Sequence, residues 1–482
     1  FDNLYGSWGP VNGQHVAGIA DTTAAQRAQV GQDGTPFGCL LQNDPNLTSP
    51  PLSDDCQDPA HGIAASHFTN DTFKIDDFIK PEDTTCPDGK PGGRPGGCTR
   101  DLVHRFYQEI YQSDGGRQDR YPTGSDAVGL TQGVYDTTSL PIYQYLHAKG
   151  APHYVLADHF FQAAHGGSFL NHQWLIAART PTDTSPVDDA NPGQLTDGAK
   201  FSVLDAAGMP INYPLYNTPD TKVDGQLTRA CQDPKSDDYD NACGRFAVNT
   251  IQPSSPPFSS SPVRLPLIDD SVYPNIGDRL TDAGISWNWY SGGWDDAAGG
   301  HPGSVFQYHH QAFNYFADYA PGKPGRAHLR DETEFIAAAK AGTLPTVSFV
   351  KPYGEENEHP GYASEPNGST HLVDLLRTIM HGGAAGNTLV VVTYDEFGGQ
   401  WDHVPPPGMG TPGVHDVWGP GTRIPALVLS RSFNRSGVDH TVYDTTSILA
   451  TIEHAFGLEP LSTRDARVPD LSNAVAIGTP RG

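Results

Sequence analysis

The 482-residue sequence is poor in positive charge and in long apolar segments. Its 30 Lys and Arg residues stand against 56 Asp and Glu residues, which gives a formal net charge of −26 at pH 7. A field of that sign repels nucleic acid and anionic membrane surfaces. No apolar run reaches ~18 residues, the length at which a segment becomes a candidate transmembrane helix. The composition therefore predicts neither a nucleic-acid partner nor integral membrane association.

Motifs that mark several enzyme and metal-binding classes are absent as well. The sequence has no G-x-S-x-G, which argues against an ordinary α/β-hydrolase esterase. Walker A and H-E-x-x-H motifs are also missing. Because the sequence lacks C-x-x-C, neither a zinc ribbon nor a thioredoxin-like motif is expected.

The six cysteines that are present lie in three close pairs, within loops rich in Gly, Pro and Asp. An even number of cysteines in such loops predicts disulfides and an oxidising compartment. Sequential pairing is the simplest connectivity. The alternative is a set of free thiols in a cytosolic enzyme. The pairs are Cys39 with Cys56, Cys86 with Cys98, and Cys231 with Cys243.

With 53 Gly and 42 Pro residues and only 18% charged residues, the chain is predicted to be globular and rich in loops. We expect a single domain over 1–482, with a loop-rich insertion at 181–265. Apolar periodicity and capping residues predict the regular elements. Helices are expected over 101–112, 140–150, 331–342, 369–383 and 444–457, and strands over 153–158, 285–290, 346–350, 388–396 and 424–430.

Strands that alternate with helices predict an α/β fold of three αβα layers, in which helices cover both faces of a mostly parallel sheet. In such sheets, functional sites form at the carboxyl ends of the strands. Asp395 and Glu396 lie at the end of an apolar strand that should be covered on both faces. Gly398 and Gly399 would let the chain bend, so that both carboxylates could reach one metal ion. The alternative is a polar turn that merely leaves the strand.

Ser168 follows another predicted strand end, where Gly166 and Gly167 precede a helix. A helix N-terminus offers free N–H groups and the positive end of a dipole to an anion. Ser168 could therefore be a nucleophile beside a bound phosphate, or simply the N-cap of the helix. Histidines nearby in the predicted fold could bind phosphoryl oxygens when protonated, or protonate a leaving alcohol. These histidines are His104, His309, His310 and His359.

Four segments together resemble a known family. They are GGSFLNHQ, VSFVKPYGEENEHPGYAS, TYDEFGGQWDHVPPP and the initial FDNLYG. In this order they resemble the bacterial acid phosphatase/phospholipase C phosphoesterase family, which is part of the alkaline-phosphatase-like superfamily. The resemblance implies an alkaline-phosphatase-like α/β fold and a serine nucleophile. The form G-G-S-x-x-N-H favours the acid phosphatase branch, because the phospholipase C branch usually has G-P-T-x-P-N-R.

The resemblance also implies roles for individual residues. Ser168, Asp395 and Glu396 would hold one divalent metal ion, and Ser168 would be the nucleophile. Calcium, magnesium, manganese, zinc and iron are all left open as its identity. His310 and His359 would act in catalysis. The other matched positions would bind substrate, and these are His309, His104, Asn171, Asp402 and His403.

In the family, the motif E-N-x-S-F-D-N adds a Glu-Asn pair to the metal site. The present sequence begins at Phe1, Asp2 and Asn3, which match the end of that motif. We therefore expect the Glu-Asn pair and the strand that carries it to lie upstream of Phe1.

The predicted function is that of a secreted or periplasmic, metal-dependent phosphomonoesterase, an acid phosphatase that forms a phosphoseryl intermediate on a small phosphate ester. Protonated His310 and His359 would fit an acidic optimum. A phospholipase C that cleaves a phosphodiester headgroup is the alternative within the family. A secreted binding module, in which Ser168 caps a helix and the acidic pair holds calcium, is the alternative from another class. The sequence leaves the oligomeric state open.

Overall fold

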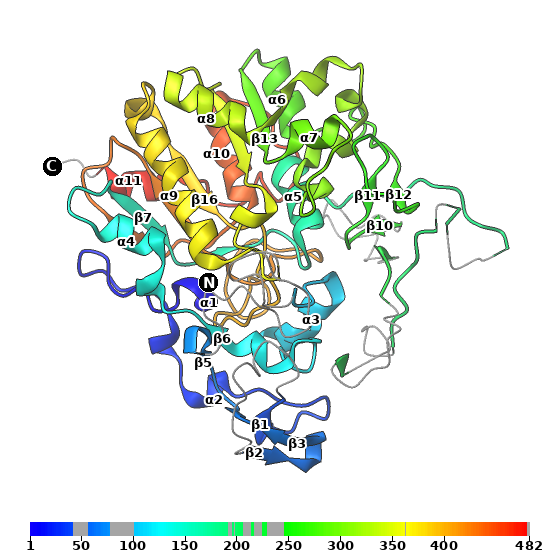
Figure 1. Ribbon diagram of the computed structural model, residues 1–482, viewed down its shortest axis with the longest axis vertical. Coiled ribbons are helices and arrows are strands. Elements are labelled where there is room, and N and C mark those ends of the chain that lie inside the picture. Colours follow the sequence, from blue (N-terminus) through cyan, green and yellow to red (C-terminus); the bar gives the residue numbers. More distant parts are fainter. Residues whose placement is uncertain are drawn as a thin grey trace.

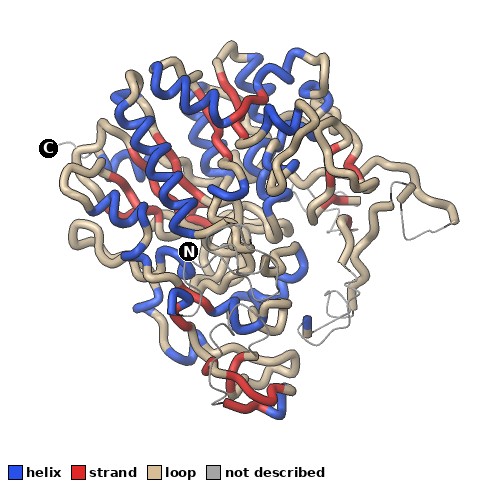
Figure 2. Tube along the Cα trace, viewed as in Figure 1, coloured by secondary structure: helices blue, strands red, loops and turns tan. Residues whose placement is uncertain are grey.

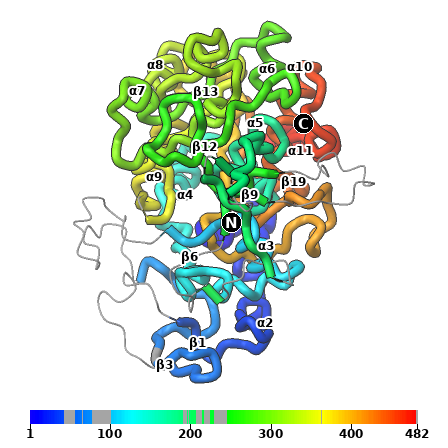
Figure 3. The backbone as a smooth tube through the Cα atoms, turned by 90° about the vertical axis from the view of Figure 1, so that its right-hand side faces the viewer, coloured from blue at the N-terminus to red at the C-terminus, as the bar shows by residue number. Residues whose placement is uncertain are grey.

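The computed structural model describes residues 1–41, 56–77, 101–190, 195–196, 198–205, 214–215, 224–228, 245–361 and 363–479. The larger sheets and the longest helices occupy one end of the molecule, and the short strands near the N-terminus occupy the other (Figure 1). The side view shows the same separation (Figure 3). Loops make up much of the chain, as its Gly and Pro content predicts (Figure 2).

The helices and strands alternate along the second half of the chain. The helices are α1 (Asp2–Tyr5), α2 (Ala24–Arg27), α3 (Phe106–Ser113), α4 (Pro141–His147), α5 (Ser168–Ala177), α6 (Ile276–Asp282), α7 (Trp294–Ala298), α8 (Glu332–Ala341), α9 (Glu365–His381), α10 (Thr446–Phe456) and α11 (Ser472–Gly478). The longer strands are β3 (Ile63–Ser66), β7 (Tyr154–Ala157), β13 (Trp287–Ser291), β14 (Leu329–Asp331), β15 (Val347–Lys351), β16 (Val390–Thr393), β17 (Ala426–Leu429) and β18 (Gly437–Asp439). The shorter strands are β1 (Cys39–Leu40), β2 (Cys56–Asp58), β4 (Phe68–Thr69), β5 (Phe73–Lys74), β6 (Gly133–Val134), β8 (Phe160–Phe161), β9 (Leu227–Thr228), β10 (Phe246–Ala247), β11 (Gln252–Pro253), β12 (Arg264–Leu265) and β19 (Tyr443–Asp444).

The strands that carry the core form two sheets rather than the one sheet that was expected. A three-stranded sheet has the order β14-β13-β15 and is parallel throughout. A four-stranded sheet has the order β16-β17-β7-β18, in which β17 runs antiparallel to both of its neighbours. The chain between β16 and β17 contains no helix that crosses the sheet, so it returns in the opposite direction. The α/β class is confirmed, and the parallel pattern is interrupted at β17.

Helices cover both faces of these sheets, as the three-layer prediction requires. Adjacent residues of β7 point to opposite faces: Leu156 packs in a core with Leu376 of α9, and Val155 packs in another with Ala474 of α11. In the other sheet, Tyr290 of β13 contacts Phe335 of α8. Its neighbour Trp289 lies in the core that includes α5 and α10. The alternation of side chains along each strand therefore builds the three layers.

Helix α9 joins the two sheets on one side. The predicted period of Leu372, Leu375, Leu376, Ile379 and Met380 gives it a wide apolar face. Leu376 and Met380 pack with the four-stranded sheet, whereas Leu375 packs with β13 and α8. A single helix thus stabilises the arrangement of both sheets.

Local signals at α8 are partly confirmed. Asp331 caps the helix by accepting a hydrogen bond from the amide of Thr333, and Gly342 ends it with a positive φ of 71°. The spacing of Asp331 and Glu334 is that of a capping box, but the box is not formed, because Glu334 pairs with Arg330 at 2.9 Å. The strand β16 is half-buried, not covered on both faces as expected. Its outer edge pairs with no strand in the described part of the chain, which leaves those side chains less covered.

The first predicted disulfide is confirmed between Cys39 and Cys56. The other four cysteines lie outside the described residues, and so does much of the expected insertion at 181–265. Its described parts contribute the short strands β9, β10, β11 and β12. None of the described helices has the length and apolarity needed to span a bilayer.

Candidate active site

Ser168 is the first residue of α5, and Asn171 organises the turn that precedes it. The Asn171 side chain accepts a hydrogen bond from the amide of Ala164 at 3.0 Å. Its amide group donates to the carbonyls of Ala164, Gly166 and Gly167 at 3.0, 3.2 and 3.3 Å. These contacts place Asn171 behind the turn, where it fixes the position of Ser168. We expected it to bind substrate, and its polar atoms are instead directed at the backbone.

Two consecutive carboxylates after β16 lie against Ser168. The Ser168 hydroxyl donates to Oε1 of Glu396 at 3.2 Å and also interacts with Asp395. Gly398 and Gly399 both have positive φ, 64° and 77°, at the bend that the sequence suggested. The amide of Gly398 donates to Oε2 of Glu396 at 2.6 Å, which holds that side chain in place. The bend therefore lets both neighbouring residues face one serine.

Lys351, at the end of β15, supplies a positive charge to this group. Its Nζ lies 3.3 Å from Oδ2 of Asp395, and Nδ1 of His172 lies 3.7 Å from the same oxygen. Burial, the largest single effect, would raise the pKa of Asp395, but the charge of Lys351 together with His172, the Ser168 hydrogen bond and His359 lowers it. Asp395 is therefore an anion in the folded protein.

His104 supplies a second positive charge, beside Glu396. Its Nε2 lies 3.7 Å from Oε1 of Glu396, and its Nδ1 lies 3.4 Å from Oδ1 of Asp101. Burial opposes protonation of His104, but these two carboxylates raise its pKa to about 9. Burial and the neighbouring charge of Asp395 raise the pKa of Glu396 to about 7, against the effect of His104.

The predicted histidines His309, His310 and His359 are brought to the same region. The ring of His172 lies 6.1 Å from that of His309 and 5.4 Å from that of His310. The ring of His359 lies 5.5 Å from that of His104. Burial lowers the pKa values of all three predicted histidines. His104 is thus the histidine of this group whose pKa is raised, and the expected catalytic roles of His310 and His359 stay predictions.

Asp402 and His403 are not brought to Ser168. Both carboxylate oxygens of Asp402 accept from Nε of the buried Arg423, at 3.0 and 3.2 Å. Asp2 joins the same network, with Arg423 at 3.0 Å and Nδ1 of His403 at 2.6 Å. These contacts are buried ion pairs that tie the first helix to the loop after β16. We expected Asp402 and His403 to bind substrate, whereas the structure places them in these contacts within the protein.

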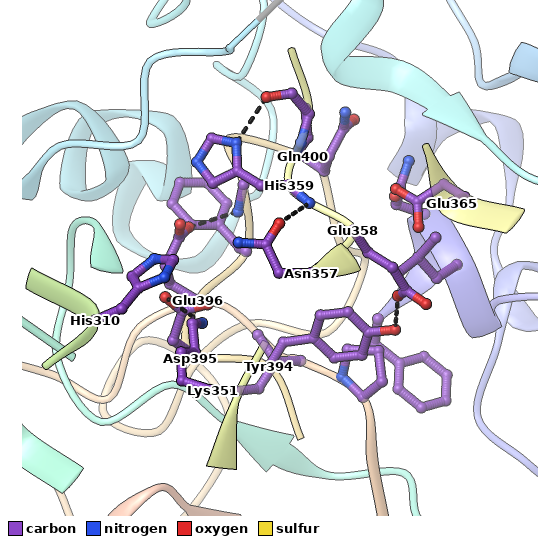
Figure 4. A pocket seen from close by; sticks show the side chains of 18 residues that line it. His310, Lys351, Asn357, Glu358, His359, Glu365, Tyr394, Asp395, Glu396 and Gln400 are labelled. Carbon is purple, nitrogen blue, oxygen red and sulfur yellow. Dashed lines mark hydrogen bonds and ion pairs between the residues drawn. The ribbon is translucent and has the colours of Figure 1, made fainter. Parts of the chain in front are cut away.

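A small cavity of about 60 Å³ lies beside the carboxylates. Figure 4 shows His310, Lys351, His359, Asp395 and Glu396 on one side of it. On the other side, the hydroxyl of Tyr394 donates to Glu358, and Glu365 lies nearby (Figure 4). The cavity borders Asp395 and Glu396, the two carboxylates beside Ser168.

The residues around Ser168 fit a divalent cation. Two carboxylates and a hydroxyl offer oxygen ligands of the kind that hard cations prefer. Oδ2 of Asp395 is buried and accepts no hydrogen bond from the described residues, so it has capacity for a metal ion. Ser168, Asp395 and Glu396 would be the ligands that this chain supplies.

Sequence reasoning missed Lys351 and His172. Both carry a signal in the sequence: Lys351 directly follows the predicted strand 346–350, and His172 is the last residue of the G-G-S-x-x-N-H segment. His172 also lies one helical turn from Ser168, and its Nδ1 is 2.5 Å from the Ser168 carbonyl. What the sequence did not show is that both would face Asp395.

Comparisons with known proteins identify the family of this chain. A model of the Phosphoesterase family matches residues 57–459, and the chain therefore belongs to that family. Phospholipase C B of Mycobacterium tuberculosis is 30% identical over 233 residues, which cover 42% of this chain and 43% of that protein. Phospholipase C A of the same organism is 31% identical over 238 residues, covering 42% and 43%. Non-hemolytic phospholipase C of Burkholderia pseudomallei is 27% identical over 254 residues, covering 44% and 34%.

The chain thus spans less than half the length of these curated relatives. A solved structure of a protein in the alkaline phosphatase superfamily, from Vibrio parahaemolyticus, aligns with 14% identity over 41% of this chain and 50% of that one. Its TM-score of 0.25 is too low to bear on the fold. The family and the curated relatives support hydrolysis of a phosphoric ester, without separating monoesters from diesters.

Proposed function

We propose that the protein hydrolyses phosphoric monoesters and that Ser168 is its nucleophile. The observation that carries this proposal is the position of Ser168. It begins a ten-residue helix, donates a hydrogen bond to Glu396, and lies beside the anionic Asp395. The N-cap of α5 is Gly167, and Ser168, at the first helical position, directs its hydroxyl to Glu396.

In the proposed reaction, Oγ of Ser168 attacks phosphorus and the bond to the leaving alcohol breaks, which gives a phosphoserine and the free alcohol. Water then attacks the phosphoserine and releases phosphate. The amides at the start of α5 and the charges of His104 and Lys351 bind the phosphoryl oxygens. A divalent metal ion on Ser168, Asp395 and Glu396 would lower the pKa of the hydroxyl and neutralise charge on the phosphoryl group.

An acidic optimum is part of the proposal. Because burial lowers the pKa values of His310 and His359, these histidines carry positive charge only below the ordinary histidine range. Their attraction for phosphate therefore grows as the pH falls. One of them, when protonated, can donate a proton to the leaving alcohol.

A phospholipase C activity on a phosphodiester is the second candidate, since the curated relatives that match are named phospholipases C. The segment G-G-S-x-x-N-H at residues 166–172 favours the monoesterase.

A secreted or periplasmic location is supported by the Cys39–Cys56 disulfide, because such bonds persist in oxidising compartments.

Two chromogenic substrates separate these candidates. We expect the purified, metal-supplemented protein to hydrolyse p-nitrophenyl phosphate faster than p-nitrophenylphosphorylcholine. The reverse preference would favour the phospholipase C. The Ser168→Ala variant should lose on the order of 10³-fold or more in turnover on either substrate while it unfolds at the same temperature. Full activity in this variant would rule out Ser168 as the nucleophile, and no hydrolysis by either protein would favour a binding module.

A further inference from the structure

A second group of side chains that can bind metal ions lies at the edge of the four-stranded sheet where β16 also ends. Asp158 and His159 follow β7 directly, and His440 follows β18. Because β7 and β18 are adjacent and parallel, their carboxyl ends meet at the same edge. The pairing of Ala157 with Asp439 brings the next residues, Asp158 and His440, side by side.

The two imidazoles converge on one carboxylate. Nδ1 of His159 lies 2.8 Å from Oδ1 of Asp158, and Nδ1 of His440 lies 2.9 Å from the same oxygen. One ligand atom from each of the three residues lies within 4.8 Å of the others. The two rings are 6.3 Å apart, at an interplanar angle of 81°. Both histidines thus present the same ring nitrogen to the same point.

Burial and access at this cluster suit an ion that arrives from solvent. The Asp158 side chain is fully buried, at 0% exposed, whereas the His159 and His440 side chains are 24% and 54% exposed. The carboxylate is therefore fixed, and the amide of Ala17 holds its second oxygen at 2.8 Å. The histidines form the open side, where they can turn and where water can occupy a further ligand position.

Apart from His159 and His440, no basic side chain among the described residues forms an ion pair with the Asp158 carboxylate. Arg423 donates to the backbone carbonyl of Asp158 at 2.9 Å, and its own charge is balanced by Asp2 and Asp402. The cluster therefore combines one buried carboxylate with two more exposed imidazole rings.

We propose that Asp158, His159 and His440 form a second divalent-metal site, which takes a borderline transition ion, zinc in the first place. Two imidazole nitrogens and one carboxylate oxygen, with a position left for water, are a donor set that zinc favours. This differs from the all-oxygen ligands around Ser168, which suit hard cations. Bonds of about 2.0–2.1 Å in a tetrahedral arrangement need ligand atoms that lie roughly 3.4 Å apart. The present separations from Asp158 are 2.8 and 2.9 Å, so the rings of His159 and His440 would turn outward to admit the ion.

This site is distinct from the one at Ser168. In the sheet order β16-β17-β7-β18, the strand that leads to Asp395 is two positions away from β7. At about 4.8 Å between neighbouring strands, the two groups are separated by roughly 10 Å along the edge. One ion cannot contact both groups, so the two sites should fill independently.

The test measures zinc binding to the full chain after removal of metal with a chelator. Equilibrium dialysis and titration calorimetry would compare the wild type with His159→Ala, His440→Ala and the double variant. The matched control is His454→Ala, which removes an exposed histidine paired with a single carboxylate, that of Asp470. The same set would be made in an Asp395→Asn, Glu396→Gln background, so that zinc bound near Ser168 is counted separately.

We expect each single variant to bind zinc at this site at least about 10-fold more weakly. The double variant should lose one zinc equivalent in both backgrounds, and His454→Ala should lose none. Cobalt bound in place of zinc should give visible absorption in the control and not in the double variant. Equal zinc stoichiometry and affinity in the wild type and the double variant would overturn the proposal. Thermal unfolding in chelator, with His159→Gln and His440→Gln as further variants, shows whether each protein is folded.

Discussion

At the scale of single residues, the neighbourhood of Ser168 depends on side chains from four separate segments. Ser168 and His172 come from α5, Lys351 from β15, Glu396 from the bend after β16, and His104 from the segment before α3. In this group, Lys351 and His104 place two positive charges beside the carboxylates of Asp395 and Glu396. Such a balance stabilises buried anions that would otherwise be costly.

Lys351 should be essential for turnover, because it is the ion-pair partner of Asp395 at 3.3 Å. Lys351→Met keeps the length of the side chain and removes its charge, and we expect kcat to fall by about 10²–10³-fold. Lys351→Arg should recover part of the loss. Lys340→Met, at an exposed position of α8, is the matched control. Steady-state kinetics on p-nitrophenyl phosphate check this, and an unchanged kcat in Lys351→Met would contradict it.

Asn171 should act on Ser168 through the turn and not through the substrate. Asn171→Ala leaves the carbonyls of Ala164, Gly166 and Gly167 without their donor, so we expect a loss of about 1–3 kcal/mol in the free energy of unfolding. Denaturant unfolding without substrate measures this. A direct substrate ligand would instead raise KM at unchanged stability, and that result would restore the role first expected from the sequence.

At the scale of elements, local patterns and long-range pairing contribute differently. The periodicity of α9 and the caps of α8 are contained in consecutive residues, so both helices could be predicted. The antiparallel direction of β17 and the half-burial of β16 depend on which strands become neighbours. An apolar run such as 388–392 is compatible with several degrees of burial.

The Cys39–Cys56 disulfide links β1 to β2 across 17 residues, part of which lies outside the described chain. Closing a loop of this size restricts the unfolded state by about 3 kcal/mol. The double variant Cys39→Ala, Cys56→Ala should lower the free energy of unfolding by that order, measured in denaturant under oxidising conditions. Reductant should lower the free energy of unfolding of the wild type by breaking this disulfide. The variant lacks the bond and should not show that loss. Equal stability of the two proteins would contradict the prediction.

At the scale of the whole molecule, buried carboxyl groups couple stability to pH. Burial and the neighbouring Asp465 raise the pKa of Glu453, on α10, to about 9. In the unfolded chain its pKa is near the ordinary glutamate value of 4.5. Between these values the native state binds more protons than the unfolded state, so the free energy of unfolding falls as the pH rises.

Glu453→Gln removes this penalty while it retains a donor for Asp465. Relative to wild type, we expect the variant to be equally stable near pH 4 and more stable by about 1–2 kcal/mol at pH 8, after allowance for solvent screening. Glu459→Gln, at an exposed position close by, serves as the control and should show no such trend. Denaturant unfolding at a series of pH values tests this, and parallel curves for Glu453→Gln and wild type would refute it.

By itself, the sequence determined the α/β class and most of the core helices and strands, which follow from local periodicity, caps and strand ends that consecutive residues carry. Its resemblance to a family implied that Ser168, Asp395 and Glu396 form one group. Only the tertiary structure decided that Lys351 and His104 are the cations at this site, and that Asp402 belongs to the network of Arg423. It also decided that β7 and β18 bring Asp158 and His440 together. Side chains far apart in the chain meet only when strands pair, and charge, burial and pKa values follow from those meetings.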